Sequence, residues 1–220
     1  MITSTNANDF TLEGGGMATY TFVDLHIPEA AGLADLTGVE ADLGRAHEYA
    51  EALQKQIRST RPDWSLVEPL SIAIAVAYSR AFGPGVRSNL REDDLTCLSP
   101  AQREAHDRIR NYRDKHVAHS INAFEHNQPR AQYCLERVET EGVTGIGSSH
   151  GRVSGLSSQD ILNVIELTNV LLRHVGLRIK QEQTKLLAIV RNMPLTQVLA
   201  GGQGAFGVNS DTPVGKARRK

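Results

Sequence analysis

The feature that most constrains this chain is an apolar stripe that recurs at steps of three and four residues over positions 36–57. It consists of Leu36, Val39, Leu43, Ala46, Ala50, Leu53 and Ile57. Steps of this size bring side chains to one face of an α-helix, whereas a half-buried strand alternates at every second residue. The segment therefore predicts a long amphipathic helix, which needs other elements to cover its apolar face.

Two further segments predict helices that could cover that stripe. Residues 70–77 are apolar nearly all round, and Gly83-Pro84-Gly85 follows, so we expect a core helix from about Pro69 to Phe82. The run Ser99-Pro100-Ala101-Gln102 supplies an N-cap serine, a proline at the first helical position and a capping-box glutamine. It predicts a third helix, which should continue to about His119.

The longest predicted helix begins at Ser158-Gln159-Asp160 and ends before Pro194. Its apolar face should carry Ile161, Ile165, Leu172, Val175, Ile179, Leu186 and Val190. Before it, residues 130–146 contain Tyr133, Val138 and Val143 and end in glycines, which predicts a small β-hairpin. The expected fold is all-α, a four-helix up-and-down bundle with a small β-hairpin insertion.

The two ends of the chain differ in composition from the segment between them. Residues 1–16 are rich in Thr, Asn and Gly and indicate a disordered leader or a cloning remnant. Residues 201–220 are rich in Gly and end in a basic cluster, Lys216-Ala217-Arg218-Arg219-Lys220, which is typical of a flexible basic tail. We therefore expect one helical domain over residues 17–200.

Charge and cysteine usage exclude several classes of function. The 24 Lys and Arg residues nearly balance the 25 Asp and Glu residues, so any contact with nucleic acid must be local. Cys97 and Cys134 form no paired motif, which argues against a disulfide framework or a thiolate zinc site. No apolar run approaches the roughly 20 residues of a membrane span, and no signal peptide is visible. These features predict a cytoplasmic protein without a membrane partner.

The third predicted helix carries the residues that are most suggestive of chemistry. Ala105, Ile109, Tyr112, His116 and His119 follow the helical spacing, so two histidines lie on a stripe that would otherwise be apolar. Histidine can act as a general acid or base near neutral pH. On an ideal helix Arg113 and His119 point about a third of a turn apart, so they converge only through the long arginine stem, a distorted helix end or a second subunit.

The segment Arg113-Asp114-Lys115-His116-Val117-Ala118-His119-Ser120 resembles the signature of HEPN domains, in which an arginine and a polar residue precede a histidine. It is most similar to HEPN proteins of the bacterial abortive-infection type. In architecture the resemblance covers roughly residues 33–193, because the motif lies near the end of one bundle helix and a long helix follows it.

The resemblance implies a metal-independent ribonuclease that needs no cofactor. Two protomers would pair so that Arg113 and His119 of each face one another across a shared cleft. His119 would transfer protons at the ribose, Arg113 would stabilise charge on the phosphate, and Asp114, at the polar position, would orient them. Tyr112 and His116 are further cleft candidates without a motif position. The implied partners are RNA, a second copy of the chain and a neutralising antitoxin protein.

Each of these residues also has a purely structural interpretation. Arg113 and His119 could form a solvated helix end, where a positive charge interacts favourably with the helix dipole. His116 could be a hydrogen-bonded core or interface histidine. Asp114 could pair with Arg110 one turn earlier on an exposed face.

Other motifs favour structural interpretations more strongly. The histidines His106, His116, His119 and His126 lack the carboxylate or thiolate that would complete a zinc site. The glycines of 145–151 suggest a hairpin more than a phosphate-binding loop, because no Gly-Lys-Ser/Thr ending follows. The acidic run Glu92-Asp93-Asp94 is more typical of a solvated turn than of a cation site.

Three functions remain as hypotheses. The leading one is an RNA endonuclease that acts as a toxin or a phage-defence effector. The second is a catalytically inactive HEPN module that binds RNA, a nucleotide or a partner protein. The third is a helical dimerisation module in which His116 and His119 only line an interface. RNA cleavage in the presence of a chelator separates the first from the other two.

Overall fold

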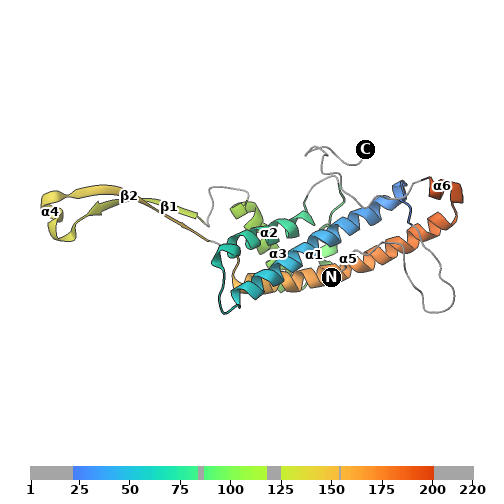
Figure 1. Ribbon diagram of the computed structural model, residues 1–220, viewed down its shortest axis with the longest axis horizontal. Helices are drawn as coiled ribbons and strands as arrows, with labels where there is room; N and C mark the ends of the chain where they lie inside the picture. The colour runs from blue at the N-terminus through green and yellow to red at the C-terminus, as the bar shows by residue number, and fades with distance from the viewer. Residues whose placement is uncertain (1–21, 84–86, 118–124, 154, 201–220) are drawn as a thin grey trace. The chain divides into compact units, whose positions relative to one another are not determined.

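The computed structural model describes residues 22–83, 87–117, 125–153 and 155–200. These residues are mostly helical and include one two-stranded antiparallel sheet (Figure 1), which confirms the mainly α-helical class predicted from the sequence. The predicted leader, residues 1–16, and the predicted basic tail, residues 201–220, lie outside the described ranges. None of the described helices is both long and apolar enough to cross a membrane.

The chain divides into two compact units. One contains residues 35–178, and the described part of the other contains residues 22–34 and 179–200. Helices α1 (Ala31–Ile57) and α5 (Ser158–Arg191) each have residues in both units.

The core of the 35–178 unit is built on the stripe that the sequence predicted for α1. Leu36, Val39, Leu43, Ala46, Ala50 and Leu53 are buried, and Ile57 is half-buried. Burying a leucine side chain of this kind contributes about 1.5–3 kcal/mol. A hydrogen bond of 2.9 Å joins His47 Nδ1 of α1 to Thr168 Oγ1 of α5, so these two helices are neighbours within the unit.

Helices α2 (Val67–Arg80) and α3 (Pro100–Tyr112) begin close to the predicted positions. The predicted capping box is confirmed: Gln102 N donates to Ser99 Oγ at 3.3 Å, and Ser99 N donates to Gln102 Oε1 at 3.0 Å. On α2, Ile74 and Tyr78 are buried but Val76 is exposed. The described residues therefore enclose only part of the apolar run of α2.

The buried face of α5 differs in detail from the predicted one. The fully enclosed residues are Ile161, Val164, Leu167, Thr168, Leu171 and Val175. Ile165 and Leu172, which we predicted on that face, are half-buried beside it. Because α5 has apolar residues over an arc wider than one stripe, periodicity alone does not identify the side that faces the core.

The predicted hairpin is present and is longer than residues 130–146. Strands β1 (Glu125–Tyr133) and β2 (Val143–Arg152) pair antiparallel, with the short helix α4 (Val138–Glu141) between them (Figure 1). Gly142 closes α4 at φ 61°, a conformation that disfavours other residues. An ion pair of 2.6 Å between Arg152 and Glu68 joins the end of β2 to α2.

The other unit contains a 3₁₀ turn (Pro28–Ala30), the first residues of α1, the end of α5 and the short helix α6 (Leu195–Leu199). Pro194 lies between α5 and α6, as expected of a residue that cannot continue a helix. A cavity of about 180 Å³ lies against this unit, with Asp24, His26, Met193 and Gln197 among its lining residues.

Candidate functional site

The candidate motif begins where the third helix changes its winding. The sequence predicted an α-helix to about His119, but the α-helix ends at Tyr112 and Arg113–Val117 forms a π-helical turn. A π-helix has i→i+5 hydrogen bonds and is found mostly as single turns, often at functional sites. The wider turn is the kind of distorted helix end that alters the relative directions of Arg113 and the residues after it.

Arg113 and Asp114 lie on the surface of this turn. The Arg113 side chain is 47% exposed, and its Nη1 contacts Asp114 Oδ1 at 2.8 Å. Asp114 therefore pairs with its neighbour, and not with Arg110 as the structural interpretation expected. An exposed pair of this kind contributes at most about 1 kcal/mol to stability. Because a guanidinium group has five N–H donors, this contact leaves most of them for an anionic ligand.

The two candidate histidines of the motif cannot be compared with the prediction. His116 belongs to the π-helical turn, but its side chain is outside what the structure describes. His119 belongs to residues 118–124, which are also outside the described ranges. The structure thus brings together Arg113 and Asp114, and the distance from either residue to His119 remains a prediction.

Tyr112, the remaining cleft candidate, is buried immediately before the π-helical turn. Burial and, to a smaller extent, the Glu68 carboxylate raise the pKa of Tyr112 to about 12, although the positive charge of Arg152 opposes them. The phenol therefore stays protonated at neutral pH. The two charged groups that act on the phenol are the partners of the Arg152–Glu68 ion pair, so Tyr112 lies near that pair at the end of β2.

His106 has a structural role that the sequence analysis did not predict. Its ring is buried, Nδ1 is 2.8 Å from Tyr78 Oη, and the ring centroid is 4.7 Å from that of Phe82. Burial lowers the pKa of His106, and the positive charge of Arg110 lowers it further. A neutral, enclosed imidazole of this kind is explained by the fold and needs no ligand.

Other motifs also have structural roles in the described chain. Residues 145–151 belong to β2, which confirms the hairpin interpretation of their glycines. The acidic run lies in a 3₁₀ helix (Glu92–Cys97), where Asp94 Oδ2 accepts from Arg91 N at 2.7 Å and Asp94 also contacts Arg178. Within the described residues, no three His, Cys, Asp or Glu side chains are grouped so that they could hold a metal ion.

The sequence analysis did not predict a second polar cluster, which is centred on Asp42. Asp42 is buried and contacts three arginines, Arg45, Arg80 and Arg87. Two turns earlier on α1, the buried Asp35 accepts a hydrogen bond of 3.1 Å from Ser88 N. A usable signal was present in the sequence, because both aspartates fall beside the apolar stripe of α1, where a carboxylate requires a partner.

Comparisons of the chain with protein-family models, with curated proteins and with solved structures returned no match.

Proposed function

We propose that this chain is a metal-independent RNA endonuclease of the HEPN type. The observation that carries the proposal is the state of Arg113, a half-exposed arginine on a π-helical turn whose contact is the adjacent Asp114. The described core does not need this arginine, whereas a phosphate in a transition state does. The motif that contains Arg113 supplies the chemical partner, His119.

The proposed reaction uses the 2′-hydroxyl of the RNA itself as the nucleophile. His119 withdraws the hydroxyl proton, the 2′-oxygen attacks the adjacent phosphorus, and the bond to the 5′-oxygen breaks. The leaving oxygen takes up a proton, from the paired protomer's histidine or from water, and a 2′,3′-cyclic phosphate results. Arg113 stabilises the charge on the phosphate oxygens, and Asp114, at 2.8 Å from Arg113, fixes the guanidinium in place.

We further infer the topology of the helical bundle and the way in which two copies of the chain assemble. The helices form a four-helix up-and-down bundle of the HEPN type, and two copies pair so that their π-helical turns border one cleft. His116 lines the cleft, and Tyr112 supports it from the buried side. In the cell the enzyme acts as a toxin or phage-defence effector and is held in check by an antitoxin protein.

The experiment that tests this proposal is an RNA cleavage assay with the full chain in excess EDTA. We expect cleavage that persists in EDTA, products that end in a cyclic phosphate, and no cleavage of a fully 2′-O-methylated RNA of the same sequence. Sedimentation at micromolar concentration should show a dimer. RNA binding without cleavage would exclude the nuclease and favour the inactive binding module. A monomer that neither binds nor cleaves RNA would exclude both functions.

A further inference from the structure

Three arginines contact the single carboxylate of Asp42. The Asp42 side chain is 2% exposed, and its Oδ2 lies 2.7 Å from Arg87 Nη2. Its Oδ1 lies 3.3 Å from Arg45 Nη1 and 3.4 Å from Arg80 Nε. Among the residues that the structure describes, Asp42 is the acidic side chain that Arg45 and Arg80 contact. Three guanidinium groups thus meet one carboxylate, so these four residues carry an excess of positive charge.

Arg87 is the arginine that neutralises Asp42. Its side chain is 23% exposed, and it also donates to Asn89 Oδ1 at 2.8 Å and to the Arg80 carbonyl at 3.0 Å. Gly38 on α1 accommodates it, because a Cβ at that position would lie 2.6 Å from Arg87 Nη1. These contacts use the guanidinium of Arg87 within the fold and fix its position.

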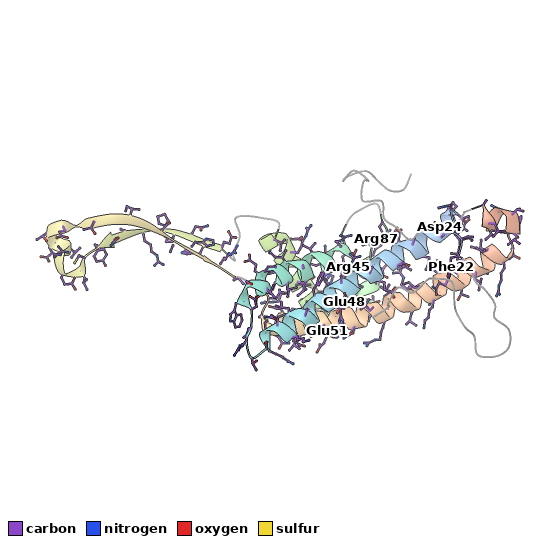
Figure 2. The ribbon with its side chains drawn as sticks, in the orientation of Figure 1. Phe22, Asp24, Arg45, Glu48, Glu51 and Arg87 are labelled. Atoms are coloured by element: carbon purple, nitrogen blue, oxygen red, sulfur yellow. The ribbon has the colours of Figure 1, made fainter. Side chains whose placement is uncertain are left out.

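Arg45 and Arg80 have a different environment. Their side chains are 51% and 61% exposed, and each has a nitrogen near the same oxygen of Asp42. Arg45 comes from the middle of α1, and Arg80 is the last residue of α2 (Figure 2 labels Arg45 and Arg87). Asp42 thus holds two like-charged groups close together at the surface, and most of their N–H donors have no partner among the described residues. A second anion that bound both groups would offset their mutual repulsion.

We propose that Arg45 and Arg80 form a phosphate-binding site whose geometry Asp42 and Arg87 maintain. Guanidinium groups bind phosphate oxygens through paired hydrogen bonds, and two adjacent guanidinium groups fit the several oxygens of one phosphate. The phosphate belongs either to the backbone of an RNA strand or to a free nucleotide.

The site is separate from the catalytic motif. Arg80 is at the C-terminal end of α2. Glu68, at the N-terminal end of the same helix, raises the pKa of Tyr112, which is the residue before Arg113. Twelve residues of α-helix span about 18 Å. The Asp42 cluster therefore adds a second phosphate contact at a distance from the proposed cleavage site, and it does not depend on whether the chain cleaves RNA.

The test is a binding measurement with an RNA that the chain cannot cleave. A fluorescent, fully 2′-O-methylated oligouridylate is titrated with wild-type protein, with Arg45→Ala/Arg80→Ala and with Arg61→Ala/Arg173→Ala. The last variant removes the same charge from exposed arginines elsewhere. We expect the Arg45/Arg80 variant to bind at least about tenfold more weakly and with a smaller salt dependence, and the control variant to bind about as well as the wild type.

Parallel titrations with ATP and with inorganic phosphate identify the source of the phosphate. Loss of ATP binding in the Arg45/Arg80 variant, with RNA binding unchanged, supports the site and assigns it to a free nucleotide. Equal effects of the two double variants on every probe would overturn the proposal. If the melting temperature of the alanine variant falls, Arg45→Gln/Arg80→Gln takes its place. Because the RNA probe cannot be cleaved, the binding result stands even if the nuclease assay shows no cleavage.

Discussion

His106 and Arg113 lie on one continuous helical run, but the first side chain is enclosed in the core and the second is exposed at the surface. His106 is buried between Tyr78 and Phe82, and its Nδ1 is within hydrogen-bonding distance of Tyr78 Oη. Arg113 is half exposed on a π-helical turn and contacts Asp114. The difference separates a polar residue that the fold requires from one whose presence the fold does not explain.

The largest expected effect on stability comes from removing the enclosed imidazole. His106→Ala leaves a cavity beside Phe82 and deprives Tyr78 of its hydrogen-bond partner, so the free energy of unfolding should fall by about 3 kcal/mol. Urea unfolding followed by circular dichroism measures the change. A loss below about 1 kcal/mol would mean that His106 is not held as tightly as its contacts indicate.

A smaller effect is expected when only the hydrogen bond is removed. Tyr78→Phe keeps the ring in the core but leaves His106 Nδ1 without its partner, which should cost about 1–2 kcal/mol. The same unfolding assay applies. In the double variant Tyr78→Phe/His106→Ala the two effects should not add, because both remove one interaction.

The contrast also shows how much the sequence alone could predict. The apolar stripe of α1, the capping box at Ser99 and the hairpin were predictable because each depends on residues close together in the chain. The Tyr78–His106 and Asp42–Arg87 contacts join residues 28 and 45 positions apart, and no local pattern encodes such a distance.

The sequence predicted part of the candidate site, and the rest depends on helix packing and on a second copy of the chain. The motif identified Arg113 and Asp114, and both lie exposed at the end of the third helix. The π-helical turn was not predicted, because its residues continue the α-helical spacing and the change of winding depends on packing of the helix end. Whether His119 meets Arg113 depends on residues 118–124 and on a second copy, so that part of the site remains a prediction.

The buried histidine should also make stability depend on pH. Burial lowers the pKa of His106 in the folded protein. Below about pH 6.5, the ordinary pKa of histidine, this side chain therefore binds a proton more readily in the unfolded chain than in the folded one. Stability should therefore decrease as the pH falls from about 6.5 through the folded-state pKa. Melting temperatures between pH 7 and pH 5 test this, and His106→Gln should have a shallower slope than the wild type. Equal slopes would contradict the assignment of a neutral, buried imidazole.

The smallest expected effect on stability is that of Arg113. Arg113→Ala removes an exposed ion pair and should change the free energy of unfolding by less than about 0.5 kcal/mol. Lys115→Ala, on the same π-helical turn, is the matched control and should behave alike. A marked loss of stability with Arg113→Ala alone would show that the arginine supports the fold, which would remove the argument for a chemical role.

The central claim is that Arg113 serves RNA cleavage and not the fold, and the most direct test is the cleavage rate per folded molecule in EDTA. Arg113→Ala and His119→Ala should each lower this rate by at least about a hundredfold, while Lys115→Ala stays within about threefold of the wild type. Wild-type rates in both the Arg113 and His119 variants, or cleavage that requires a divalent metal ion, would contradict the account.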